Sequence, residues 1–261
     1  MIAVLFANVE KDPGLRVTKE AAGILEDSGC ACLLYEGEPS VLDGADAVLS
    51  FGGDGTFLRC AKLALPYGVP VLGVCLGHTG FLSRVSPDEL SVLRGLSGFP
   101  VADRTVLDVT LLGCEERHFV AVNDAVFSRG VDVQTVSLTI DADGTSLGSF
   151  LGDGVILSSS TGSTGYAFSA GGPVADPSLS CIVVTPICAH ASRGHAFVLS
   201  PERVLTVTPE DPERRSVFFS ADGEEPVRLR EGAEVRIART PLRCLEPVPG
   251  CFFDNVRIHR M

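Results

Sequence analysis

The sequence predicts a doubly wound α/β domain with a parallel sheet, followed by a β-rich domain resembling a β-sandwich. Over the first hundred residues, short apolar runs alternate with segments whose apolar residues recur at helical spacing. Beyond Pro100 the helical spacing stops, and short strands separated by turn residues take over. A length of 261 residues is enough for two such domains.

In the first domain we expect four strands alternating with three helices. Continuous apolar runs, typical of buried parallel strands, predict strands at 2–7, 31–35, 45–51 and 69–75. Apolar residues at helical spacing predict helices at 15–27, 56–65 and 87–96. Ser86 followed by Glu89 has the spacing of a capping box at the start of the last helix.

The second domain is predicted from strand-like runs bounded by turns. The expected strands are 106–112, 118–127, 134–140, 146–150, 155–157, 181–187, 217–220, 226–229 and 234–238. Residues 141–144 read Asp-Ala-Asp-Gly, a hairpin turn signal, and the charged run 209–215 is expected to be a solvated loop. A last strand at 252–258 is expected to return to the first domain. The predicted domains are therefore 1–99, with a return of about 247–261, and 100–246.

Composition and charge narrow the functional classes. A net charge of −12 and a pI near 4.8 argue against a nucleic-acid binder or a protein of anionic membranes. No stretch approaches the ~20 apolar residues of a membrane span. The nine cysteines form no C-x-x-C pair, so we expect free thiols in a reducing compartment. The amino-terminal run lacks a basic flank and reads as a strand, so a cytoplasmic location is predicted.

A glycine-rich turn follows the third predicted strand, reading Gly52-Gly53-Asp54-Gly55-Thr56. Glycines at the end of a strand let an anion approach the backbone, and the next helix offers unpaired N–H groups. The turn matches neither the P-loop pattern nor the dinucleotide fingerprint. These residues alone leave two alternatives open: a phosphate-binding loop, or an ordinary turn in which Asp54 caps the helix.

A second polar stretch, 152–173, repeats the Gly-Asp-Gly theme and then places six Ser or Thr among the seven residues before Gly165. That many hydroxyl groups suit a polar ligand rich in oxygen atoms. The stretch contains no G-x-S-x-G elbow, so a serine hydrolase is poorly supported. The alternative is a solvated Ser/Thr-rich loop, although Gly171-Gly172-Pro173 tightens the chain just after it.

Taken together and in order, these motifs resemble the NAD kinase family. The resemblance covers nearly the whole chain and rests on 52–56, "GHTGFL" at 77–82, Asn123-Asp124, 152–173, "VTPICAH" at 184–190 and Asp222-Gly223. The first motif alone is weak, because diacylglycerol kinases and phosphofructokinases carry similar loops. The long second stretch is far more specific.

The resemblance implies that the γ-phosphoryl group of ATP is transferred, with Mg²⁺, to the 2′-hydroxyl of the adenosine ribose of NAD. It implies Asp54 as the catalytic acid–base residue and Gly52 and Gly53 as phosphate-binding residues. It also implies substrate contacts from Gly55, Arg59, Phe81, Asn123, Asp124, Asp153, Thr161, Thr164, Gly165, Tyr166, Ala167, Phe168, Ser169 and Cys188. The partners would be NAD and ATP, with polyphosphate left open as a donor, and the family commonly forms homodimers and homotetramers.

The chain departs from the family pattern at Ser159-Ser160, at Gly165, at Leu151 where a basic residue is common, and over 189–197. These departures concern substrate contacts and leave Asp54 untouched. Two other functions stay open: a kinase of the same superfold acting on a lipid or a sugar, and a nucleotide-binding regulator without catalysis. His78, in the motif at 77–82, is a further candidate for ligand contact.

Overall fold

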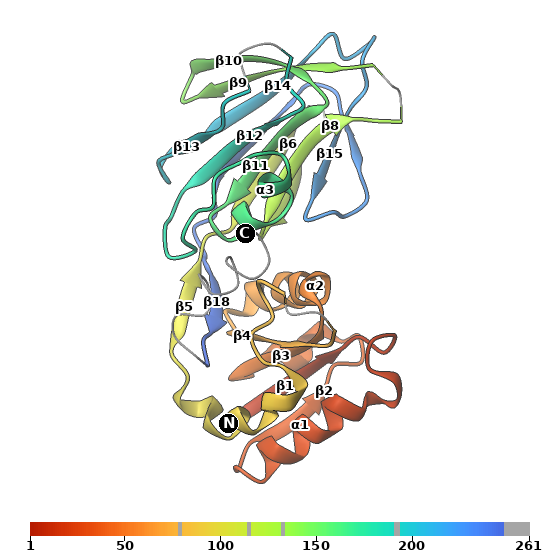
Figure 1. Ribbon diagram of the computed structural model, residues 1–261, viewed down its shortest axis with the longest axis vertical. Coiled ribbons are helices and arrows are strands. Elements are labelled where there is room, and N and C mark those ends of the chain that lie inside the picture. The colour runs from red at the N-terminus through yellow and green to blue at the C-terminus, as the bar shows by residue number, and fades with distance from the viewer. Residues whose placement is uncertain (78–79, 114–115, 132–133, 191–193, 248–261) are drawn as a thin grey trace. The chain divides into compact units, whose positions relative to one another are not determined.

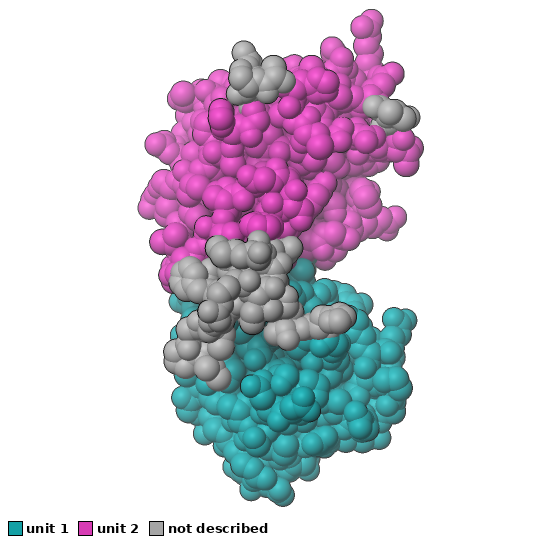
Figure 2. Space-filling model, viewed as in Figure 1, with its two compact units in different colours: residues 1–103, 240–261 teal, residues 104–239 magenta. Residues whose placement is uncertain are grey.

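The computed structural model describes residues 1–77, 80–113, 116–131, 134–190 and 194–247. The chain divides into two compact units, Met1–Asp103 with Thr240–Met261, and Arg104–Arg239 (Figure 2). Each unit has a core of its own, and each is described by itself below.

The first unit is a six-stranded sheet in the order β2-β1-β3-β4-β18-β5. Its strands are β1 (Ile2–Ala7), β2 (Ala31–Leu34), β3 (Ala47–Gly52), β4 (Val71–Cys75), β5 (Val101–Arg104) and β18 (Leu242–Leu245). Strands β1 to β4 pair in parallel, as the alternation of strands and helices predicts.

Helices cover both faces of this sheet (Figure 1). Helix α1 (Arg16–Glu26) and the 3₁₀ helix η4 (Pro87–Gly98) pack their apolar residues against one face, through Leu25 and Leu93 among others. Helix α2 (Asp54–Ala64) lies on the opposite face, where Phe57 approaches Gly73 of β4. The predicted doubly wound fold is therefore confirmed. The short 3₁₀ turns are η1 (Pro13–Leu15), η2 (Pro39–Leu42) and η3 (Leu65–Tyr67).

The second unit consists of two six-stranded sheets, in the orders β10-β9-β14-β17-β6-β7 and β13-β12-β11-β8-β15-β16 (Figure 1). One sheet contains β6 (Leu107–Leu112), β7 (Arg117–Ala121), β9 (Val136–Ala142), β10 (Thr145–Gly152), β14 (Leu205–Glu210) and β17 (Gly232–Ile237). The other contains β8 (Asp124–Arg129), β11 (Gly154–Ser159), β12 (Ile182–Ile187), β13 (Phe197–Leu199), β15 (Val217–Ala221) and β16 (Val227–Leu229).

Apolar residues from both sheets form one core, including Leu138 and Val235 from the first sheet and Phe127 and Phe219 from the second. Among the described residues, the strand pairings in these two sheets are antiparallel. The β-sandwich-like prediction is confirmed. Two short helical segments, η5 (Thr161–Thr164) and α3 (Tyr166–Ser169), follow β11.

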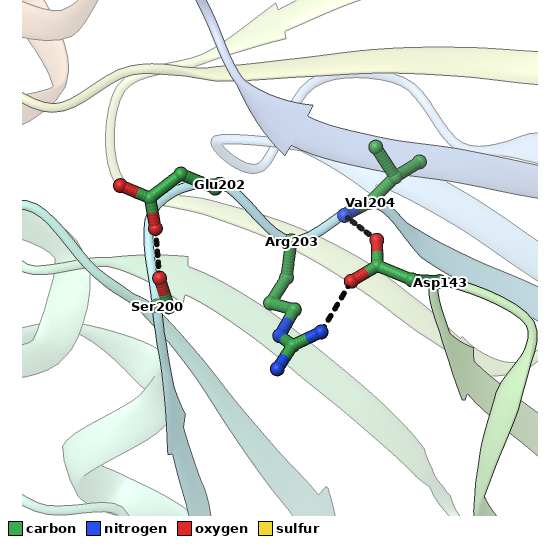
Figure 3. Close-up of polar contacts among 5 residues, drawn as sticks. All are labelled: Asp143, Ser200, Glu202, Arg203 and Val204. Atoms are coloured by element: carbon green, nitrogen blue, oxygen red, sulfur yellow. Dashed lines mark hydrogen bonds and ion pairs between the residues drawn. The ribbon is translucent and has the colours of Figure 1, made fainter.

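The predicted hairpin at 141–144 is confirmed. Asp143 and Gly144 both have positive φ, 49° and 77°, as a two-residue type I′ turn requires. The Asp143 carboxylate also accepts bonds from the Arg203 guanidinium (2.6 Å) and the Val204 N–H (2.9 Å), which attach the turn to the chain entering β14 (Figure 3). Nearby, Ser200 donates to Glu202. The two bonds to Asp143, that from Arg203 first and that from Val204 second, lower the pKa of the Asp143 carboxyl.

Several predicted elements need correction. The single strand expected at 118–127 is two strands, β7 and β8, in different sheets. The chain breaks at Val122–Asn123 because the Asp222 carboxylate accepts the N–H groups there in place of a neighbouring strand. The helix expected at 87–96 is 3₁₀, although its predicted capping box is present.

Strands β5, β13, β14 and β18 were not predicted individually. Strand β14 extends to Glu210, so the solvated loop expected at 209–215 begins later than its charge suggests. The strand expected at 252–258 lies outside the described residues. No helix in the described part of the chain is long and apolar enough to cross a membrane.

Candidate active site

The glycine-rich turn connects β3 to α2, and Asp54 is the first residue of that helix. Gly53, not Asp54, is the N-cap, and no side-chain cap bond is present. Instead the Asp54 carboxylate accepts three backbone N–H groups of the chain that follows β4: Phe81 at 3.0 Å, Leu82 at 3.2 Å and Ser83 at 3.3 Å. The alternative in which Asp54 caps the helix is therefore wrong.

Gly80 allows this close approach. A Cβ atom on Gly80 would lie 2.1 Å from Oδ1 of Asp54, well inside van der Waals contact. Any other residue at this position would force the carboxylate or the loop to move. The loop from Gly80 to Ser83 therefore orients Asp54 through its own backbone.

The glycines of the turn have different reasons to lack side chains. A Cβ on Gly52 would overlap the Thr56 side chain, at 2.3 to 2.8 Å. A Cβ on Gly53 would lie 2.8 Å from the amine nitrogen of Lys11, and one on Gly55 would meet nothing within 4 Å. Gly52 is therefore required by packing within the chain, whether or not phosphate binds the turn.

A pocket of about 680 Å³ opens beside Asp54 within the first unit. It is lined by Lys11, Gly53, Asp54, Leu76, Gly77, Gly80 and Pro87. Arg59 is exposed on α2 and does not line this pocket. Phe81 is half-buried and reaches Asp54 with its backbone N–H, and His78 lies outside the described residues.

Cys75, at the end of β4, is the thiol next to this loop. Burial is the main cause that raises its pKa, and the Asp54 charge adds to the effect. A thiol with a raised pKa is a poor nucleophile at neutral pH. Cys75 is therefore a packing residue.

In the second unit, Asn123 and Asp124 stand where β7 gives way to β8. The Asp222 carboxylate accepts the backbone N–H groups of Val122 (2.9 Å), Asn123 (2.7 Å) and Asp124 (3.1 Å). Asp222 adopts a positive φ of 51°, and its own N–H donates to the Asp124 carbonyl. This double connection fixes the Asn123–Asp124 backbone.

The hydroxyl-rich stretch packs against the same turn. The Ser159 N–H donates to the Asn123 carbonyl at 2.9 Å, and its hydroxyl donates to the Val122 carbonyl at 2.6 Å. A Cβ on Gly162 would lie 1.9 Å from the Asn123 carbonyl oxygen. A Cβ atom on Gly165 would lie 3.7 Å from the Asn123 amide nitrogen and 3.7 Å from an Asp124 carboxylate oxygen. The structure thus brings Asn123, Asp124 and the 161–165 segment together.

These hydroxyls are buried rather than solvated. Ser163 is fully buried and bonds the Ser160 carbonyl and the Ala175 N–H. In contrast Asn123 Oδ1, Ser160 Oγ and Thr161 Oγ1 are buried with no hydrogen-bond partner among the described residues. The stretch is therefore not a solvated loop, and these three buried oxygens are exceptions to the rule that buried polar atoms are hydrogen-bonded.

The other predicted residues of this unit are dispersed. On α3, Tyr166 is exposed (47%) and Ser169 is exposed, Phe168 is half-buried, and Ala167 is buried in the unit's interior. Thr164 is buried and donates to the Thr161 carbonyl at 3.5 Å.

Asp153 and Cys188 lie at the opposite end of β11 from Asn123. The Asp153 N–H donates to the Ile187 carbonyl, and its carboxylate forms an ion pair with Arg129 at 2.8 Å. In the pairing of β11 with β8, Gly154 lies opposite Ser128, whereas Ser158 lies opposite Asp124. At about 3.3 Å per residue, Asp153 and Cys188 lie roughly 15 to 20 Å from Asn123. The structure does not bring Asp153 and Cys188 to Asn123 within this unit.

Comparison with known proteins places this arrangement in a family. The ATP-NAD kinase N-terminal domain model matches residues 6–94, and the ATP-NAD kinase C-terminal domain model matches residues 122–244. The chain is 36% identical to an NAD kinase from Symbiobacterium thermophilum over 97% of this chain and 96% of the relative. The chain belongs to the ATP-NAD kinase family. It is also 32% identical to an NAD kinase from Chloroflexus aurantiacus, over 93% and 91% of the two chains.

Solved structures of an NAD kinase and of an NADH kinase share the fold. An NAD kinase from Archaeoglobus fulgidus, solved in complex with ATP, superposes with a TM-score of 0.82 at 24% identity, covering 98% of this chain and 97% of that one. A yeast NADH kinase complexed with NADH gives a TM-score of 0.86 at 23% identity, covering 98% and 86%.

Sequence reasoning missed three residues of these sites. Gly80 and Asp222 lie in motifs that were recognised, but no role was assigned to either. Gly80 stands two residues before the apolar Leu82 in a loop, and Asp222 belongs to an Asp-Gly pair that follows a strand. These two patterns are the signals that could have found them. Lys11 carries no local signal, because only the fold brings the loop after β1 to the glycine turn.

Proposed function

We propose that this chain transfers the γ-phosphoryl group of ATP to the 2′-hydroxyl of the adenosine ribose of NAD, giving NADP and ADP. Membership of the ATP-NAD kinase family supports the reaction. One observation carries it: Asp54 lines a pocket at the start of α2, and three backbone N–H groups hold its carboxylate there.

Asp54 acts as the acid–base residue. The ribose 2′-oxygen bonds to the γ-phosphorus, the bond from that phosphorus to the β,γ-bridging oxygen breaks, and ADP leaves. The 2′-hydroxyl proton passes to the Asp54 carboxylate. A positioned general base of this kind contributes about 10²- to 10⁴-fold to the rate. Gly52, Gly53 and Gly55 bind phosphate beside the amino end of α2, where the helix dipole favours negative charge.

In the second unit, Asn123, Asp124, Thr161, Thr164 and Gly165 bind the dinucleotide. The buried, unpartnered oxygens of Asn123, Ser160 and Thr161 support this, since a bound ligand would supply the hydrogen bonds that they lack. Tyr166, Phe168 and Ser169, on the exposed and half-buried side of α3, are further contacts, whereas the buried Ala167 shapes the turn.

Asp153 and Cys188 serve NAD only if ligand extends to their end of β11 or a second copy of the chain supplies them. Arg59 and Phe81 are proposed as contacts from the exposed side of α2 and the loop after β4. Assembly into dimers or tetramers, a cytoplasmic location and the use of polyphosphate stay predictions from the resemblance and the sequence.

The divalent ion arrives with the nucleotide, as MgATP. Among the described residues, no group of three or more His, Cys, Asp or Glu side chains could hold a metal ion. Mg²⁺ is usually bound by one or two carboxylates together with substrate phosphates, and the single carboxylate of this pocket fits that mode. The ion would neutralise phosphate charge.

The test is NADP formation from NAD, ATP and Mg²⁺, measured beside Asp54→Asn. We expect the variant to fold normally and to lose about 10²-fold or more of kcat. Absence of NADP with the unaltered chain would refute the function, and full activity of Asp54→Asn would refute only the proposed base. Supplying diacylglycerol or a sugar in place of NAD tests the alternative kinases, and nucleotide binding without turnover would indicate the regulator.

A further inference from the structure

Lys11, in the loop between β1 and α1, is the cationic side chain that lines the pocket of Asp54. Its amine nitrogen lies 2.8 Å from the point that a Cβ atom on Gly53 would occupy. Arg59, a basic residue among the substrate contacts that the resemblance implies, is five residues beyond Asp54 on α2. At 3.6 residues per turn that is about 140° around the helix. The fold therefore presents Lys11, rather than Arg59, to the glycine turn.

Asn8 holds the Lys11 backbone in this position. The Asn8 side-chain oxygen accepts the N–H groups of Glu10 (3.0 Å) and Lys11 (3.3 Å), and its amide donates to the Thr56 hydroxyl (3.3 Å). The Asn8 N–H donates to the Phe51 carbonyl at the end of β3. One side chain thus connects the loop that carries Lys11 to the first turn of α2.

The Lys11 side chain is exposed at the pocket, beside the amino end of α2. Amino ends of helices carry partial positive charge, so they stabilise anions and disfavour cations. Among the described residues, no carboxylate forms an ion pair with Lys11, and the one acid lining the pocket, Asp54, accepts N–H groups from the loop. A lysine and a helix amino end that line one pocket can both bind the same anion.

We propose that Lys11 binds the phosphate oxygens of the nucleotide triphosphate and stabilises the charge left on the diphosphate as the γ-phosphoryl group transfers. This rests on the proposed kinase function and adds a residue to it. An ammonium group is a compact point charge suited to phosphate oxygens. Gly53 is glycine, on this account, because a side chain there would displace the Lys11 amine.

The experiment compares Lys11→Met and Lys11→Arg with Lys19→Met. Methionine keeps the length of the side chain and removes its charge. Lys19 is an exposed lysine of α1 that donates to the Gly14 carbonyl and does not line the pocket, so it is the matched control. Steady-state kinetics are measured with ATP and NAD varied separately, and ADP binding is measured by calorimetry.

For Lys11→Met we expect kcat/KM for ATP to fall about 10²-fold, as when one preorganised charge donor is removed from a reacting group. Affinity for ADP should fall at least about tenfold, with KM for NAD within about twofold of the unaltered chain. Lys11→Arg should recover part of the loss, and Lys19→Met should match the unaltered chain. A merely structural role of Lys11 would not separate ATP from NAD in this way.

The proposal is overturned if Lys11→Met keeps kcat/KM for ATP and ADP affinity within about twofold, or if NAD affinity alone falls. Lys11→Gln, with thermal unfolding recorded for both variants, guards against a folding defect particular to methionine. An unaltered chain that makes no NADP would refute the kinase function itself. ADP calorimetry on the same chains would then still decide whether Lys11 contacts phosphate.

Discussion

At the scale of single residues, the position of the Asp54 carboxylate depends on Gly80. The carboxylate takes three N–H groups from a loop that can approach it only because Gly80 has no side chain. A carboxylate fixed in this way is already oriented before substrate binds, and orientation is much of what a phosphoryl-transfer enzyme supplies.

The Gly80→Ala variant tests this arrangement. The added methyl group would overlap Asp54 Oδ1, so the carboxylate or the loop must shift. We expect NADP formation to fall by about 10²-fold, the loss typical of a misplacement of about 1 Å at a reacting group. Gly98→Ala, which meets nothing within 4 Å and has no positive φ, is the control. Equal activity of the two variants would contradict the role of Gly80.

Among elements, the break between β7 and β8 depends on Asp222. The N–H groups of three consecutive residues, Val122, Asn123 and Asp124, donate to its carboxylate. Hydrogen bonds to a charged group contribute about 1.5 to 3 kcal/mol each when measured by mutation. The turn that carries Asn123 and Asp124 therefore depends on one side chain from a distant strand connection.

Two substitutions of Asp222 should separate the effect of its carboxylate from the effect of its positive φ. Asp222→Asn retains one acceptor oxygen and tolerates the positive φ, whereas Asp222→Ala loses both advantages. We expect Asp222→Ala to lower the free energy of unfolding by about 2 to 4 kcal/mol, and Asp222→Asn by less. Urea unfolding measures both, and equal losses would contradict the account.

The outer face of one sheet contains a second polar cluster, around Glu210 of β14. Its carboxylate accepts hydroxyls from Ser137 (2.6 Å), Ser149 (2.7 Å) and Thr139 (2.7 Å) on β9 and β10. These bonds, that from Ser137 foremost, lower the Glu210 pKa from 4.5 to about 2. A carboxyl whose folded pKa is depressed stabilises the fold above its unfolded pKa, and this stabilisation is lost as the pH falls toward the folded value.

As the pH falls from about 4.5 to about 2, the unaltered chain should therefore lose the stabilisation that the Glu210 carboxylate provides. Glu210→Gln lacks this carboxylate, so it has no such contribution to lose. The expected result is a shallower decline of the urea midpoint with falling pH in Glu210→Gln. Glu234→Gln, an exposed position on neighbouring β17, should behave like the unaltered chain. Parallel acid profiles for all three proteins would exclude the cluster as a source of pH dependence.

At the scale of the whole molecule, the chain builds two cores from three segments. The second unit is continuous, and its core is made entirely of its own residues. The first unit is discontinuous, because β18 returns from the far end of the sequence and lies between β4 and β5.

A chain of residues 104–239 alone should therefore fold. Its two sheets and their shared core are complete within that segment, and 136 residues bury enough surface for independent stability. A cooperative urea transition followed by circular dichroism would confirm this. A non-cooperative change would mean that the second unit depends on the first.

How much was predictable varies with the range of the interactions. Strand β1 and the β9–β10 hairpin were predicted closely, because an apolar run and an Asp-Gly pair act on the backbone locally. The division of 118–127 into two strands could not be predicted, since its cause is a carboxylate about a hundred residues away. Strand β18, a four-residue run, is defined as a strand only by its place beside β4.

The sequence by itself determined the two-part fold and the family, and the resemblance to that family singled out Asp54, since periodicity and glycine motifs are local properties of the chain. Only the tertiary structure decided what Asp54 contacts, why Gly80 must be glycine, which cation lines the pocket, and that Asp153 lies far along β11 from Asn123. The physical reason is that these are distances between residues that are remote in sequence, and they exist only once the sheets have paired.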